Sequence, residues 1–361
     1  MDHDSLEQNT PPRYMPSTIE RTIHEVINNK MTQKNASFNA AYEFTNTLGK
    51  DVRVIWAVNG VGTKIIVAKM MGVFDSVGYD VVALNVNDVL CSGIKPLIFS
   101  DYLACHEKIT KETVDSIENG IIKACKEGGI EAISGETPII SEMLAEHSDP
   151  GRTFELAGFA MGITSGNPIN GSKMKEGDIV VGLASSGLHA NGYTLARPTL
   201  LKFYKGIGPY DLDSGFDGSK LGDILLRPTK MYVNEIMHSL KDKEEDIEIS
   251  GLGHITGGGF SKLLRLCRFS DKGIILNNMP EPPALMKEIK RLGGISDYEM
   301  YRTFNMGIGF VTIMPQQSVE NFITICEQCG TKAQQIGMVS SAKGKQVTIR
   351  NGNDEIKYDS E

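Results

Sequence analysis

The sequence predicts a mixed α/β protein with two domains, and three observations lead to this prediction. The chain has 361 residues, enough for two hydrophobic cores of ordinary size. From residue 52 to residue 166, strand-like apolar runs are interspersed with runs of helical period. A cluster of turn-forming residues at 167–172 then interrupts the pattern and marks the expected domain boundary.

These boundaries divide the chain into four parts. Residues 1–34 are predicted to form a polar arm and one helix, and residues 35–168 the first domain. Residues 169–345 are predicted to form the second domain. Residues 346–361 are expected to be a C-terminal hairpin or tail, because an Asn-Gly pair separates two alternating runs.

The period of the apolar residues predicts the elements in order. Short apolar runs without a helical period are assigned to strands, and longer amphipathic runs to helices. In the first part of the chain, helices are predicted at 17–29, 63–71 and 111–127, and strands at 52–58, 81–91, 97–104, 131–134 and 155–163. In the second domain, strands are predicted at 178–184, 274–276, 306–313 and 333–339, and helices at 195–204, 221–226, 232–240, 260–266 and 318–326.

The composition excludes several classes of function. The formal net charge is -8, whereas a general binder of nucleic acid or acidic membranes needs a basic surface. No apolar run approaches the roughly 20 residues that span a bilayer. The first residues are too polar for a secretory signal. We therefore expect a cytoplasmic protein whose six cysteines are reduced.

The best candidate for a phosphate site is the stretch Asn-Gly-Val-Gly-Thr-Lys at 59–64, between a strand-like run and a helix-like run. Gly60 and Gly62 allow backbone N–H groups to approach an anion, and the N-terminus of the next helix adds positive potential. Lys64 adds a full positive charge. A plain strand-to-helix turn is the alternative, because the stretch matches neither a Walker A loop nor a dinucleotide fingerprint.

Three carboxylates are candidates for a magnesium site. Asp88 and Asp101 lie at the ends of two successive strand-like runs, and Glu136 follows a third. Carboxylates at strand ends can converge on one rim of a domain, where Mg²⁺ with nucleotide phosphates needs oxygen ligands. Each one alone is more simply a turn residue or a helix cap. Together with Lys64 they favour a metal and nucleotide site.

Two loops of the second domain are candidates for substrate binding. The loop at 185–193 combines hydroxyls, small residues and His189, which suits it to enclosing an anion. The stretch 251–259 is the densest glycine cluster in the chain, and its His254 is expected to point into the site. The stretch 298–309 is interpreted either as part of the site or as packing beneath it.

Several motifs, in their order along the chain, resemble those of phosphoribosylformylglycinamidine cyclo-ligase, also called aminoimidazole ribonucleotide synthetase. The resemblance extends from about residue 52 to residue 339. It rests on Gly60-Val-Gly-Thr-Lys64, Asn87-Asp88, Gly135-Glu-Thr137, Leu156-Ala-Gly-Phe159, Ser185-Ser-Gly-Leu-His189, Asn191-Gly-Tyr193, His254-Ile-Thr-Gly-Gly-Gly259 and Met300-Tyr-Arg-Thr-Phe-Asn-Met-Gly307.

The resemblance implies a fold and an activity. The N-terminal α/β domain would form a β-barrel with the same domain of a partner in a homodimer. A second α/β domain would follow, with the active site in the cleft between the domains. The reaction would be an ATP-dependent ring closure in purine biosynthesis, in which ATP activates the formyl amide oxygen of formylglycinamidine ribonucleotide. A nitrogen of the substrate would then attack that carbon, and phosphate would leave.

The resemblance also implies roles for individual residues. His254, His189 and Lys64 are expected to take part in catalysis, and Mg²⁺ is expected at Asn59, Asp88 and Glu136. The residues expected to bind ATP are Gly60, Gly62, Thr63, Lys64, Asp101, Gly135 and Thr137. The residues expected to bind the ribonucleotide are Ser185, Ser186, Gly187, His189, Asn191, Gly257 and Gly258.

Departures from the family pattern concern the nucleotide half. Asn59 stands where the family has Asp, so one expected metal ligand is neutral. The segment 37–41, which corresponds to the family's glycine-rich lid, lacks glycine. Two alternatives to the cyclo-ligase follow. One is a paralogue that phosphorylates a different amide oxygen, and the other is a pseudoenzyme that binds a ribonucleotide or a partner without turnover.

Overall fold

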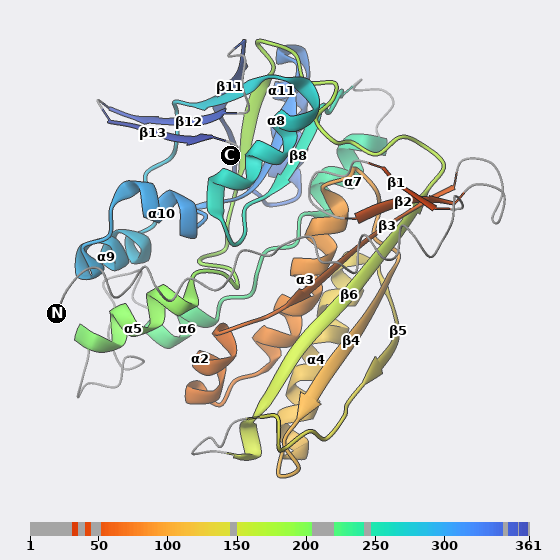
Figure 1. The fold of residues 1–361 in the computed structure, drawn as a ribbon, viewed down its shortest axis with the longest axis vertical. Helices are drawn as coiled ribbons and strands as arrows, with labels where there is room; N and C mark the ends of the chain where they lie inside the picture. Colours follow the sequence, from red (N-terminus) through yellow and green to blue (C-terminus); the bar gives the residue numbers. More distant parts are fainter. Residues whose placement is uncertain are drawn as a thin grey trace.

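The computed structural model describes residues 31–34, 40–44, 52–144, 150–203, 220–241, 247–341, 346–352 and 354–359. These residues form two α/β domains, each built on one sheet (Figure 1). The predicted fold class is thus confirmed. The helix predicted at 17–29 and most of the segment expected to be a lid lie outside the described residues.

The first domain contains a six-stranded sheet. Its strands lie in the order β1 (Met31–Lys34), β2 (Ala40–Phe44), β3 (Val52–Gly60), β6 (Phe154–Thr164), β4 (Ile98–Cys105) and β5 (Glu131–Glu136). Neighbouring strands are antiparallel except for β4 and β5, which are parallel. Because β1 is part of this sheet, residues 31–34 belong to the first domain and not to the predicted arm.

Two long helices, α3 (Asp75–Leu90) and α4 (Lys111–Gly128), lie along one face of this sheet (Figure 1). Glycines bring the two helices into close contact. A Cβ atom at Gly78 would lie 2.0 Å from the Ile117 carbonyl oxygen, and one at Gly120 would lie 1.9 Å from that of Asp75. The short helix α2 (Lys64–Met71) follows β3 directly, as predicted.

The prediction of a strand at 81–91 is wrong, because these residues form the second half of α3. The run is apolar or buried almost throughout, since α3 lies between the sheet, α4 and the second domain. A helix buried on all sides lacks an exposed polar face, so its period cannot be distinguished from that of a buried strand. Asp88 therefore lies in the last turn of a helix.

The second domain contains a seven-stranded sheet with the order β13-β12-β9-β11-β7-β10-β8. Only β12 and β9 pair in parallel. The strands are β7 (Ile179–Ala184), β8 (Gly251–His254), β9 (Gly273–Leu276), β10 (Ile308–Met314), β11 (Ala333–Ser340), β12 (Gln346–Asn351) and β13 (Asp354–Asp359). The predicted C-terminal hairpin is confirmed as β12 and β13, and it belongs to the sheet of the second domain.

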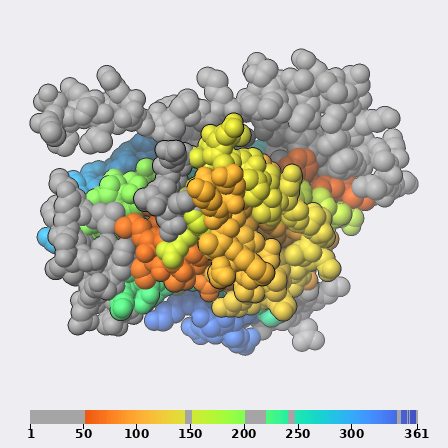
Figure 2. All heavy atoms as spheres, turned by 90° about the horizontal axis from the view of Figure 1, so that it is seen from below, coloured from red at the N-terminus to blue at the C-terminus, as the bar shows by residue number. Residues whose placement is uncertain are grey.

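The helices of the second domain confirm most of the predicted positions. They are α5 (Tyr193–Phe203), α6 (Leu221–Leu226), α7 (Val233–Lys241), α8 (Leu264–Ser270), α9 (Ala284–Gly293), α10 (Asp297–Thr303) and α11 (Val319–Gln328). Seen from below, the orange and yellow atoms of the first domain occupy the centre of the molecular face (Figure 2).

None of the helices in the described residues combines the length and the apolar character needed to cross a bilayer.

Candidate active site

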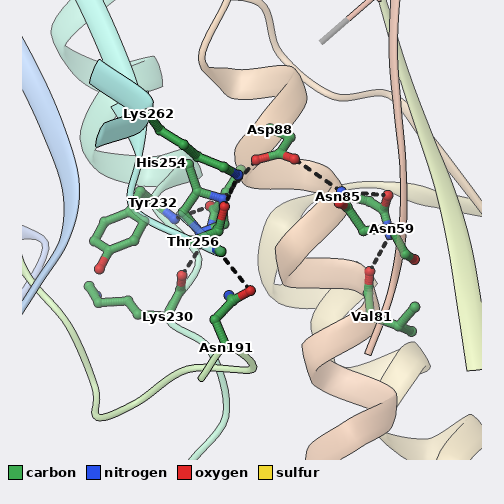
Figure 3. Close-up of polar contacts among 12 residues, drawn as sticks. Asn59, Val81, Asn85, Asp88, Asn191, Lys230, Tyr232, His254, Thr256 and Lys262 are labelled. Atoms are coloured by element: carbon green, nitrogen blue, oxygen red, sulfur yellow. Dashed lines mark hydrogen bonds and ion pairs between the residues drawn. The ribbon is translucent and has the colours of Figure 1, made fainter. Parts of the chain in front are cut away.

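Three side chains from both domains form a hydrogen-bonded chain near the end of the first sheet (Figure 3). Asp88, in the last turn of α3, lies between Asn59 on β3 and His254 at the end of β8. His254 Nδ1 is 2.8 Å from Asp88 Oδ1, and Asn59 Nδ2 donates to Asp88 Oδ2 at 3.0 Å. The sequence singled out all three residues, and the structure brings them together.

The hydrogen bonds assign the protonation of this chain. The ring of His254 is fully buried, and burial lowers its pKa although Asp88 opposes the shift. Burial alone would raise the pKa of Asp88, but the hydrogen bond from His254, the charge of Lys262 and the Asn59 amide hold it below the usual value. A neutral His254 that donates from Nδ1 to an ionised Asp88 fits both shifts. Its Nε2 can then accept from the Asn87 amide, 3.4 Å away.

Lys262 is a site residue that the sequence analysis missed. It lies in the short helical turn after the glycine cluster (Gly259–Leu263), and its ammonium group donates to Thr256 Oγ1. Figure 3 shows that the side chain extends toward Asp88. Burial lowers the pKa of Lys262, and the charge of Asp88 opposes this effect. The only feature of the sequence that could have indicated Lys262 as a site residue is its position just after the glycine-rich turn.

Asn59 and Asp88 meet, but the third expected magnesium ligand, Glu136, lies apart from them. Asn59 and Asp101 face the helices, in register with Gly158 between them. Glu136 is in register with Tyr102, the next residue along β4, so its side chain projects from the opposite face of the sheet. Glu136 is also three strands from β3 in the sheet order, or on the order of 14 Å. The structure therefore does not support a metal site built from Asn59, Asp88 and Glu136.

The groups around Asp88 do not suit Mg²⁺ either. The ion needs oxygen ligands, but Asn59 turns its NH₂ group toward Asp88 and also donates to Asn85 Oδ1 at 3.2 Å. The partners of Asp88 are thus N–H donors and cations. In the described residues, no group of three or more His, Cys, Asp or Glu side chains is arranged to hold a metal ion.

The predicted phosphate loop is only partly as expected. Gly60 and Gly62 are exposed, and Gly62 has a positive φ of 72°, as a tight turn requires. Thr63 contacts the second domain, with its hydroxyl 3.0 Å from that of Thr194. Lys64, however, is fully buried, and its ammonium lies 2.7 Å from Asp80 and donates to the Arg227 carbonyl at 2.8 Å. In this structure Lys64 therefore contacts protein groups and is not open to a phosphate.

Lys64 is one member of a set of buried contacts between α3 and the segment 227–232, which we call the connector. Asp80 Oδ1 accepts from both the backbone N–H and the hydroxyl of Thr229, each at 2.7 Å. Asn87 donates to the Lys230 carbonyl at 2.8 Å and accepts from the Tyr232 N–H at 3.1 Å. The polar side chains on this face of α3 thus hold the second domain against the first.

The loop at 185–192 is shaped from within by His189 and from below by Asn305. His189 is fully buried with φ 63°, and its Nε2 accepts from the Ser186 N–H at 3.2 Å. Asn305 accepts from the Ser185 hydroxyl at 3.0 Å and donates to the Gly187 carbonyl at 2.8 Å. His189 therefore supports the loop instead of pointing out of it. For the stretch 298–309, the packing interpretation is confirmed, because Asn305 and its neighbours lie beneath this loop.

Asn191 joins the two glycine-rich loops. Its Oδ1 accepts from the Gly257 N–H at 3.0 Å. Figure 3 shows the Asn191 side chain near Thr256, the residue before Gly257. Its Nδ2 is buried and has no hydrogen-bond partner among the described residues. Gly257 is exposed, and Gly258 has a positive φ of 93°. The predicted substrate loops thus lie side by side, and a buried donor lies between them.

The remaining predicted ATP residues lie on β4 and β5. Gly135 is next to Asp101, and a Cβ atom at position 135 would lie 2.6 Å from Asp101 Oδ1. Burial raises the pKa of Asp101, and the charge of Glu118 adds to this effect. Thr137 is exposed just after β5. These three residues are close to one another but lie two or more strands away from Asn59.

A cavity of about 530 Å³ lies between the domains, lined by Tyr79, Lys123 and Glu127 of the first domain and by Ser186, connector residues and Cys329 of the second. Asp88 and His254 are not part of its lining. Of the residues expected to bind the ribonucleotide, Ser186 is part of this lining.

The buried His189 allows a prediction about stability and pH. Burial lowers the pKa of His189 well below 6.5, and the charges of Lys64 and Lys230 lower it further. Below pH 6.5 the unfolded chain takes up a proton that the folded chain does not, so the free energy of unfolding should fall on acidification. The slope for one histidine is up to about 1.4 kcal/mol per pH unit. Urea unfolding between pH 7.5 and 5.5 should show a smaller slope in His189→Asn, and an unchanged slope would contradict the assignment.

Both domains of the fold match domains of a known family. Two family models match: "AIR synthase related protein, N-terminal domain" over residues 39–164, and "AIR synthase related protein, C-terminal domain" over residues 175–350. The chain belongs to this family.

Relatives within the family carry a more specific name. The phosphoribosylformylglycinamidine cyclo-ligase of Methanocaldococcus jannaschii is 40% identical over 292 residues, which cover 80% of this chain and 79% of the relative. That of Pseudothermotoga lettingae is 42% identical over 315 residues, covering 85% of this chain and 88% of the relative. The family resemblance seen in the motifs is therefore confirmed.

Solved structures share the fold at lower identity. A HypE-HypF complex contains a chain with TM-score 0.63 and 19% identity, and the match covers 95% of this chain and 98% of that chain. Thiamine monophosphate kinase from Aquifex aeolicus has TM-score 0.62 and 16% identity, with 100% of both chains covered. These similarities support the two-domain architecture.

Proposed function

We propose that this chain is an ATP-dependent cyclo-ligase that converts formylglycinamidine ribonucleotide to aminoimidazole ribonucleotide, ADP and phosphate. The observation that carries the proposal is the 40–42% identity to cyclo-ligases over at least four-fifths of the chain. The arrangement of the site is consistent with it, because Asn191 joins both substrate loops. As an enzyme of purine biosynthesis, the protein would act in the cytoplasm.

The proposed reaction assigns a task to each part of the site. The γ-phosphoryl group of ATP moves to the formyl oxygen, an amidine-side nitrogen attacks the same carbon, and phosphate leaves with that oxygen. The exposed backbone at Gly60 and Gly62 would bind nucleotide phosphate. ATP would arrive as its magnesium complex, with the ion on the triphosphate. The loops at 185–191 and 257–258 would bind the ribonucleotide. His254 Nε2, whose contact with the Asn87 amide is long at 3.4 Å, would take the proton released at ring closure.

The test is an assay of the purified full-length protein with formylglycinamidine ribonucleotide, ATP and Mg²⁺. We expect aminoimidazole ribonucleotide and ADP to form in equal amounts. Equal ATP hydrolysis with and without the ribonucleotide would contradict a coupled ring closure. Binding of the ribonucleotide without hydrolysis would favour the pseudoenzyme, and turnover of another amide would favour the paralogue.

Asn191 is expected to contribute to substrate affinity. In Asn191→Ala, the ribonucleotide would lose the buried Nδ2 donor, and the Gly257 N–H would lose its acceptor. A lost hydrogen bond of this kind costs about 1–3 kcal/mol, so KM for the ribonucleotide should rise about tenfold or more. Steady-state kinetics of the exposed Asn277→Ala provide the matched control. A normal KM in Asn191→Ala would show that the ribonucleotide does not contact this loop.

The exposed face of the first sheet supports a homodimer. Four large apolar side chains on strands of this sheet remain accessible: Val58 (65% exposed), Ile133 (53%), Tyr102 (43%) and Ile163 (43%). Val58, Tyr102 and Ile163 lie on the face opposite α3 and α4. An apolar sheet face of this kind is typical of a protein-protein interface. We propose that a second copy covers it and completes a β-barrel.

Val58→Asp is expected to weaken this dimer. A charge buried without a partner at an interface costs several kcal/mol, which corresponds to more than about a hundredfold in the dissociation constant. Sedimentation equilibrium should therefore detect monomers of the variant at concentrations where the wild type is dimeric. Val73→Asp serves as control, because Val73 is exposed but lies between α2 and α3, outside the sheet. If both variants stay dimeric, the interface lies elsewhere.

A further inference from the structure

The carboxylate of Asp88 is enclosed by donors and positive charge. His254 Nδ1 contacts one oxygen at 2.8 Å, and Asn59 Nδ2 contacts the other at 3.0 Å. The positive charges of Lys262 and Arg265 also act on this part of the structure. Burial lowers the pKa of both side chains, and the negative charge of Asp88 counteracts this by favouring their charged forms. The residue is only 7% exposed.

This environment differs from a divalent-cation site in two respects. First, Mg²⁺ is held by oxygen atoms, usually carboxylates together with waters and phosphates. Asn59 could supply an oxygen only by turning its amide, and this would break its bonds to Asn85 and Asp88. Second, the lysine ammonium extends toward the carboxylate (Figure 3). A dication placed there would be repelled by Lys262 at close range.

We propose that in this chain Lys262 takes the place of a divalent cation at Asp88, and that the ionised Asp88 orients His254. Asp88 and Lys262 are then positioning residues for His254. Any magnesium ion that ATP brings is bound by the phosphates and by groups other than Asp88. This inference concerns the same site as the proposed function and rests on it to that extent. Its test is independent, because metal binding can be measured without turnover.

The experiment measures Mn²⁺ binding to the full-length protein by electron paramagnetic resonance, without nucleotide. The wild type and Asp88→Asn should bind the same number of Mn²⁺ ions with the same affinity. The control is Asp115→Asn, because Asp115 is an exposed carboxylate paired with Lys111 on α4. In a second variant, Asn59→Asp combined with Lys262→Glu, one additional Mn²⁺ ion per chain should bind. Adding Asp88→Asn to that variant should remove it.

Two results would overturn the proposal. One is the loss of a bound Mn²⁺ ion in Asp88→Asn but not in Asp115→Asn. The other is the absence of any additional ion in Asn59→Asp/Lys262→Glu. If Asp88→Asn does not fold, NMR of the wild-type protein tests the same point, because the ring N–H signal of His254 reports on metal binding at the neighbouring Asp88. The proposal expects no shift of this signal with Mg²⁺, whereas a saturable shift would contradict it. A failure of the ring-closure assay would leave these metal counts unchanged.

Discussion

Replacement of His254 by glutamine is expected to lower turnover by about a hundredfold or more, the range typical for a lost acid-base group. Glutamine retains an N–H donor for Asp88 but cannot exchange a proton near neutral pH. The loss should therefore appear in kcat, while KM for ATP changes little, because Gly60 and Gly62 lie on a different segment. Steady-state kinetics with both substrates varied would separate the two parameters.

The control for this experiment is His189→Gln. His189 is also fully buried, but its ring supports the loop at 185–192 through Ser186. We expect this variant to alter KM for the ribonucleotide more than kcat. Normal turnover of folded His254→Gln would show that the histidine has a structural role and that another group or water handles the proton. Circular dichroism of both variants would establish that they are folded.

Removal of the Lys64 ammonium is expected to have the largest effect on stability. In Lys64→Met, the Asp80 carboxylate remains buried without its 2.7 Å ion-pair partner. Breaking a buried pair in this way costs about 3–5 kcal/mol. The free energy of unfolding, measured with urea, should fall by that amount. Lys111→Met is the control, because its pair with Asp115 is exposed and the expected loss is below about 1 kcal/mol.

The double variant Lys64→Met/Asp80→Asn distinguishes a structural ion pair from a phosphate-binding lysine. An amide at position 80 can still accept from Thr229, and no unpaired charge remains, so much of the lost stability should return. A positive coupling energy in this cycle would confirm the pairing. If Lys64→Met were instead stable but lost affinity for ATP, the lysine would serve the nucleotide, as the sequence motif suggested.

Local patterns predicted β3 to β6 of the first domain, β7 and β9 to β11 of the second, and the C-terminal hairpin, because alternation and an Asn-Gly turn are properties of neighbouring residues. They did not predict β1, β2 or β8. They failed at 81–91, where burial on every side removed the polar face that identifies a helix. They also failed for Lys64. Its partners, Asp80 and the Arg227 carbonyl, lie 16 and 163 residues away, and no local pattern reports on them.

The chemistry of the site was predictable in part. Asn59, Asp88 and His254 were recognised as polar residues in unusual positions, and they do meet. Their interactions could not be predicted, because Asn59 and Lys262 come from segments far from Asp88 in the chain and no local pattern places an amide N–H and a lysine beside it. His189 shows the opposite error, since a histidine in a polar loop suggested exposure. The structure uses it as an internal support because its φ of 63° turns the ring inward against Tyr232.

The contacts between α3 and the connector restrict how the enzyme can open. Asp80 and Asn87 each bind the connector, and the next residue, Asp88, carries the link to His254. Rotation of one domain away from the other would break these buried bonds and the contact between Asp88 and His254 at the same moment. The two domains should therefore behave as one rigid body during the catalytic cycle. Substrates would enter through movements of surface loops, and the amide protons of Thr229 and Tyr232 should exchange with solvent only on global unfolding.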